Sequence, residues 1–102
     1  MTIKPYTAVG LIPTVRGIRV RADIKHNLTH LKSLSKAASW LSRLDLPVRL
    51  IAIPEGALQG FNDEVLDVDH EEFAKTCAID IPGWETDVLG GIAREYNSFI
   101  IA

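Results

Sequence analysis

A single carboxylate, Glu55, stands where α/β proteins often carry their chemistry. It follows the apolar run Val48–Ile53, from which only Pro54 separates it. Active sites of open parallel sheets form at the carboxyl ends of the strands, and a partly buried carboxylate there can act as a general base. The alternative is a capping or salt-bridged glutamate in a turn, because Pro54, Gly56 and Gly60 indicate a loop.

The sequence holds one cysteine, Cys77, which lies in a predicted helix rather than after a strand. A lone cysteine on a helix is usually a small buried apolar group. We therefore do not expect Cys77 to act as a nucleophile beside Glu55, and we expect the neighbouring Lys75 to be a solvated charge. One cysteine also excludes a disulfide framework and a cysteine-rich zinc site.

Two clusters have side chains that could bind metals, but neither has the pattern of a known metal site. His26 and His30 are four residues apart, yet no carboxylate accompanies them. The acidic cluster lacks the glycine and the spacing of a calcium loop; its members are Asp67, Asp69, His70, Glu71 and Glu72. Gly90-Gly91 lies in a helical pattern rather than after a strand, so no phosphate loop is predicted. We expect no metal and no cofactor.

Three apolar runs predict the strands that would position Glu55. They are Tyr6–Ile12, Val48–Ile53 and Phe99–Ala102. The second and third are nearly continuous in Ile, Leu, Val and Ala, which is typical of parallel strands covered on both faces.

Three helices are predicted between these strands. Asn27 is a good N-cap for the first helix, and the polar, basic segment 16–26 before it is predicted to be a loop. The helix has one apolar stripe at helical spacing, made of Leu28, Leu31, Leu34, Ala38, Leu41 and Leu44. Asp69 can cap a short helix that runs to about Cys77. The third helix follows the turn at Pro82-Gly83, and Asn97 suits a left-handed residue at its end.

The predicted order is β-α-β-α-α-β, with three parallel strands joined by right-handed crossovers. No linker divides the chain, so residues 1–102 are predicted to form a single α/β domain. A buried-type strand at the last residue and a sheet of only three strands indicate that this domain is incomplete. Its exposed sheet edges favour some association.

Composition and charge exclude several classes of protein. With 47% apolar and 24% charged residues, the chain has the composition of a globular protein. Residues 1–50 contain nine Lys and Arg but two Asp and Glu, whereas residues 51–102 contain two and eleven. The basic stretch 16–25 lacks interleaved aromatic residues, so we expect no nucleic-acid partner. No apolar run approaches the ~20 residues of a membrane span, and no signal-peptide pattern is present. We expect a cytoplasmic protein with no membrane partner.

Four motifs in order resemble the carbon–nitrogen hydrolase (nitrilase) superfamily. Leu50-Ile51-Ala52-Ile53-Pro54-Glu55 is similar to its strand and catalytic glutamate, and Leu58-Gln59-Gly60 to its aliphatic amidase and formamidase branch. Asp23 to Asn27 leads into the first long helix, and Ile81-Pro82-Gly83 with Glu85-Thr86 into a later one. Ala93-Arg94-Glu95-Tyr96-Asn97 and Phe99-Ile100-Ile101-Ala102 resemble the approach to the third strand and the strand itself. The resemblance runs from about Tyr6 to the last residue.

This resemblance implies an α-β-β-α sandwich, of which the chain is the N-terminal portion, and a Glu-Lys-Cys triad. It also implies a homo-oligomer, a dimer or a larger assembly. Glu55 would be the general base, whereas the lysine and the nucleophilic cysteine lie on later strands in the family. The family usually has an aromatic residue directly after the glutamate, and this chain has Gly56. Phe61 and Trp84 are the nearest bulky residues that could replace it, although a core role is favoured for each.

The predicted function is hydrolysis of a non-peptide carbon–nitrogen bond in a small amide or nitrile. Because the lysine and cysteine of the triad are missing, the 102-residue chain alone is predicted to be inactive. The alternative is a non-catalytic α/β module of the same fold that binds a partner or a metabolite.

Overall fold

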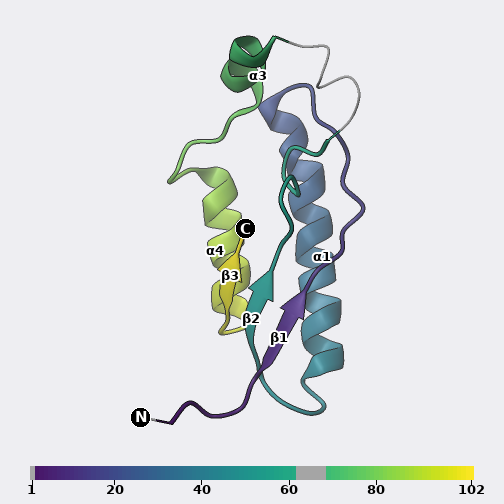
Figure 1. Cartoon of the computed structure of the whole chain (residues 1–102), viewed down its shortest axis with the longest axis vertical. Helices are drawn as coiled ribbons and strands as arrows, with labels where there is room; N and C mark the ends of the chain where they lie inside the picture. Colours follow the sequence, from purple (N-terminus) through teal and green to yellow (C-terminus); the bar gives the residue numbers. More distant parts are fainter. Residues whose placement is uncertain (1, 62–68) are drawn as a thin grey trace.

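The computed structural model describes residues 2–61 and 69–102. The three strands are β1 (Thr7–Gly10), β2 (Val48–Ala52) and β3 (Phe99–Ile101). They form one parallel sheet in the order β1-β2-β3, so β2 is the central strand (Figure 1). The β-α-β-α-α-β order and the parallel pairing are as predicted, although each strand is shorter than its apolar run.

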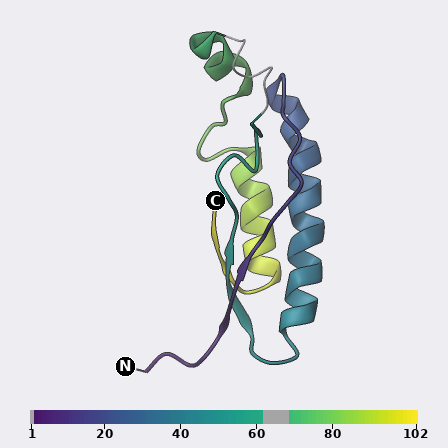
Figure 2. The same cartoon turned by 45° about the vertical axis from the view of Figure 1, so that its right-hand side comes forward.

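The two longer helices lie on one side of the sheet. The connection from β1 to β2 contains a 3₁₀ turn, η1 (Arg21–Asp23), and the long helix α1 (Ile24–Ser42). The connection from β2 to β3 contains α3 (His70–Cys77) and α4 (Trp84–Glu95). Figure 2 shows α1 and α4 together on the same face of the sheet. This is expected because both crossover connections have the same handedness and each strand is added on the same side of the previous one.

The core lies between the sheet and these two helices. Val9, Ile51 and Ile100 are register partners across the three strands, and all three pack into the core. Because side chains alternate along a strand, the neighbouring rows point to the other face. These rows are Ala8, Leu50 and Phe99, and Gly10, Ala52 and Ile101.

That second face is apolar and uncovered. Phe99 is 80% exposed and Ile101 59% exposed, so the prediction that both faces of β3 are covered is wrong for the described chain. The Cα radius of gyration is 15.3 Å, whereas a compact domain of this length has about 13 Å. The chain therefore has one helical layer and one sheet layer, and no described element packs on the outer face of the sheet.

The first helix begins earlier than predicted. Asp23 is its N-cap, and Asn27 lies inside α1 rather than at its start. Part of the predicted loop 16–26 is thus η1 and the first turn of α1. The carboxylate of Asp23 accepts hydrogen bonds from the backbone N–H groups of Arg19 and Val20, at 3.1 and 3.3 Å. These bonds close the turn that leads into the helix.

The buried stripe of α1 also differs from the prediction in its second half. Leu28 and Leu31 are buried as expected, but Leu41 and Leu44 are 61% and 76% exposed. The buried face continues instead through Ser35 and Ser39. The hydroxyls of these two serines are buried and have no hydrogen-bond partner among the described residues. Leu41 lies on the exposed side of the last turn, and Leu44 follows the end of the helix at Ser42, so neither continues the buried stripe.

The later helices agree with the prediction. Asp69 caps α3 by accepting a hydrogen bond from the backbone N–H of Glu72, at 3.2 Å. In α4, Ile92 is buried, and Asn97 follows the helix with a φ of 48°, in the left-handed region. Among the described helices, none is both long enough and apolar enough to cross a bilayer.

Candidate active-site loop and its supports

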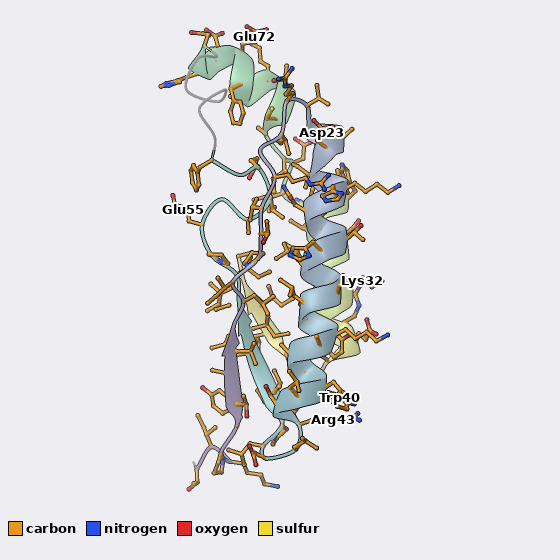
Figure 3. The ribbon with its side chains drawn as sticks, turned by 90° about the vertical axis from the view of Figure 1, so that its right-hand side faces the viewer. Asp23, Lys32, Trp40, Arg43, Glu55 and Glu72 are labelled. Carbon is orange, nitrogen blue, oxygen red and sulfur yellow. The ribbon has the colours of Figure 1, made fainter. Side chains whose placement is uncertain are left out.

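Glu55 follows the central strand of the sheet, as the sequence predicts. The strand direction continues to Ile53, whose backbone N–H donates to Ile101 O at 2.8 Å. The chain then turns at Pro54, and the Glu55 side chain is exposed. Figure 3 shows Glu55 pointing away from α1, toward the side of the uncovered sheet face. We expect Glu55 to be largely hidden from water in a complete domain, and the described chain has no layer on that side to hide it.

The loop that carries Glu55 is anchored at its far end. The backbone N–H of Gly60 donates to Gly56 O at 2.6 Å, which closes a turn. The N–H of Ile18 donates to Gln59 O at 3.0 Å, so the loop is joined to the segment before η1. Gly60 has a φ of 75°, and a Cβ at this position would lie 2.8 Å from Arg16 O. Only glycine fits both this backbone and this close approach.

Asn27 ties the same loop to α1. Its side chain is 2% exposed, and its Oδ1 accepts a hydrogen bond from the backbone N–H of Arg16 at 3.0 Å. Its Nδ2 donates to Arg16 O and to Leu58 O, both at 2.8 Å. Both donor hydrogens of the carboxamide are therefore used. Asn27 holds together the helix, the segment at residue 16 and the loop after β2.

The position after Glu55 has a physical reason to be glycine. Gly56 has a φ of 74°, in the left-handed region, and a Cβ there would overlap the ring of Phe61. The ring of Phe61, which is 75% exposed, therefore lies against Gly56. The core role favoured for Phe61 is wrong, and Trp84, which is 38% exposed, also lies outside the buried core.

A second group of charges lies where η1 meets the start of α4. The Arg21 guanidinium binds both oxygens of Glu85, with Nε–Oε1 at 2.5 Å and Nη2–Oε2 at 2.9 Å. Its Nη1 also contacts Asp80 Oδ2 at 2.9 Å. Glu85 is fully buried. The hydrogen bonds from Arg21 hold the pKa of Glu85 below its usual range, although burial opposes them, and Glu85 and Asp80 raise the pKa of Arg21.

This ion pair joins parts of the chain that are 64 residues apart. The sequence predicts Glu85 as an acidic residue at a helix N-terminus, which it is, but does not predict its burial. Thr86 caps the same helix, since its hydroxyl accepts from Gly83 N–H at 2.8 Å and contacts Gly83 O at 2.8 Å. The pair serves to dock α4 on η1.

Cys77 is fully buried in the core, at the end of α3. Its thiol donates to Arg19 O at 3.3 Å. Lys75 is exposed and pairs with Glu71 at 3.0 Å, one helical turn away. Cys77 is thus a small buried group and Lys75 is a charge on the surface, as expected for these two residues.

Among residues 2–61 and 69–102, no group of three or more His, Cys, Asp and Glu side chains could hold a metal ion. His26 and His30 lie on the exposed side of α1 or at its margin. In the acidic cluster, Asp69 caps α3 and Glu71 pairs with Lys75, whereas Asp67 lies outside the described residues.

The described residues place one carboxylate, Glu55, after the carboxyl end of the central strand, whereas Cys77 and Lys75 are engaged in contacts of their own. Sequence reasoning named Asn27 as an N-cap and Glu85 as an acidic residue at the start of a helix, but it missed their burial and their bonds to distant segments. Comparisons with protein-family models, with curated proteins and with solved structures found no match.

Proposed function

We propose that this chain forms the part of a nitrilase-like carbon–nitrogen hydrolase that carries the general base, Glu55. The observation that supports this most is the position of Glu55. It follows the central strand of a parallel sheet, on an anchored loop, and points toward the side of an apolar sheet face. A second sheet packed on that face would complete a sandwich and enclose the carboxylate.

In this proposal Glu55 accepts a proton from a cysteine thiol, and the thiolate attacks the carbon of a small amide or nitrile. A lysine stabilises the negative charge that develops on the tetrahedral intermediate. Both partners would come from strands that are not among these 102 residues. Phe61, beside Gly56, would form one wall of the substrate pocket.

The test is to express the whole reading frame that contains these residues and to measure ammonia release from acetamide, formamide and simple nitriles. Glu55→Gln should lower turnover by roughly 10²–10⁴-fold, the range for loss of a general base. Glu72→Gln is the matched control, because Glu72 is exposed on α3, remote from Glu55 (Figure 3). Full activity of Glu55→Gln would contradict the proposal.

The second candidate is a non-catalytic α/β module that binds a partner or a metabolite. The state of the one cysteine favours it, since Cys77 is buried and bonded to Arg19 O. If the whole reading frame adds no lysine and no cysteine after further strands, the non-catalytic module is favoured over the hydrolase. For this module, the uncovered apolar face supports our proposal that the protein forms a homo-oligomer.

A further inference from the structure

A groove lies at the opposite end of the sheet from Glu55, between the last turns of α1 and α4. It has a volume of about 810 Å³, within the range of small-molecule sites. Its walls include Ala37 and Trp40 of α1 and Tyr96 at the end of α4, and its lining is mostly apolar. Trp40 is 57% exposed, which is unusual for so large an apolar side chain without a partner.

The lining of the groove includes a residue whose hydroxyl is buried. Ser39 lines it and is 8% exposed, and its hydroxyl has no hydrogen-bond partner among the described residues. A buried hydroxyl without a partner is costly. Because the hydroxyl itself is buried, it does not open onto the groove and offers no contact to a ligand there.

Cations outnumber anions around this groove. Lys36, Arg43 and Arg49 line it together with one carboxylate, Glu95. Arg49 is held in place because its Nη1 donates to Val48 O at 3.2 Å and to Asn97 O at 3.4 Å. In the described part of the chain, none of the three cations forms an ion pair with a carboxylate. The negative ends of α1 and α4 offset roughly one unit of charge, which leaves the groove positive.

An apolar groove with a positive rim matches a ligand with an apolar body and one negative charge. We propose that the groove binds a small amphipathic carboxylate, with its hydrocarbon part along Ala37 and Trp40 and its carboxylate near Arg43 and Arg49. This site does not depend on the proposed function, because it lies at the other end of the sheet from Glu55.

Fluorescence of the 102-residue chain tests the proposal. The chain has two tryptophans, so Trp84→Phe leaves Trp40 as the sole reporter. Titration with decanoate below its micellar concentration should change the Trp40 emission in a saturable way. No saturable change up to millimolar decanoate would overturn the proposal.

Two arms test the role of charge. The triple variant Lys36→Gln/Arg43→Gln/Arg49→Gln should weaken decanoate binding by roughly tenfold or more, as should replacing decanoate by the uncharged decanol. Lys32→Gln is the matched control, since Lys32 is an exposed cation one turn before Lys36 and outside the groove (Figure 3). Equal binding of decanol, or an equal loss in Lys32→Gln, would refute recognition of the carboxylate.

Two further variants test the location. Ala37→Glu places a bulky anion in the groove at an exposed helical position and should abolish binding, with helicity by circular dichroism unchanged. Ile101→Glu alters the uncovered face of the sheet and should leave binding intact. The reverse pattern would show that decanoate binds the sheet face instead, and the proposal would be wrong.

Discussion

Replacing Asn27 by alanine should destabilise the chain more than any other single change to a polar side chain of α1. The substitution removes three hydrogen bonds and leaves the N–H and C=O of Arg16 and the C=O of Leu58 without this partner. A hydrogen bond contributes about 1 kcal/mol net, and a buried group left unpaired costs about 1–3 kcal/mol. Because Arg16 is exposed, water can reach its backbone, so we expect a loss near the lower limit, about 3 kcal/mol in total.

Urea unfolding followed by circular dichroism measures this loss. About 3 kcal/mol is a large part of the stability of about 5–15 kcal/mol typical of a domain, so the unfolding midpoint should fall markedly. Thr29→Ala is the control, because the hydroxyl of Thr29 is exposed and bonds only to Lys25 O of its own helix; it should change stability by less than about 0.5 kcal/mol. A loss of stability below about 1 kcal/mol for Asn27→Ala would show that Asn27 does not hold these segments together.

Three further outcomes are expected. Gly60→Ala should lower the free energy of unfolding by roughly 1–3 kcal/mol, because the φ of this residue is positive and a Cβ there would collide with the backbone. Gly10→Ala is the control: it has open space around it and should leave the stability measured by urea unfolding unchanged. The Arg21–Glu85 pair lowers the pKa of Glu85 in the folded chain. Its contribution to the free energy of unfolding is therefore full above the pKa that Glu85 has in the unfolded chain, and it is lost as pH falls through the pKa of the folded chain. The difference in stability between wild type and Arg21→Gln should shrink from pH 7 toward pH 3, and a constant difference would contradict this. The 102-residue chain should release no ammonia from amides or nitriles, and turnover that disappears in Cys77→Ala would show that residue to be the nucleophile after all.

Features with local causes could be predicted from the sequence. The three strands follow from apolar runs, α3 from the cap at Asp69, and the left-handed Asn97 from its place after α4. Glu55 also lies where the strand pattern places it, although its catalytic role stays a prediction.

Features that depend on distant partners could not be predicted. Asn27 satisfies the local rule for an N-cap, yet it bonds to Leu58, 31 residues away. Glu85 fits the start of a helix, yet Arg21, 64 residues away, binds it in a buried position. Leu41 and Leu44 fit the spacing of the helical stripe, yet Leu41 is exposed at the end of α1 and Leu44 lies beyond the helix. In these cases the tertiary structure, and not the local spacing of residue types, determines where the side chain lies.

The length of α1 has a consequence for how the molecule opens. Its 19 residues span about 28 Å, whereas the five residues of β2 span about 17 Å. The first turns of α1 therefore extend past the strands, where loops rather than strand pairing hold them (Figure 1). These turns, the segment at residue 16 and the Glu55 loop share their hydrogen bonds, so they should detach as one cooperative unit while the sheet stays paired. Amide hydrogens of this unit should exchange with solvent together, and faster than those of β2.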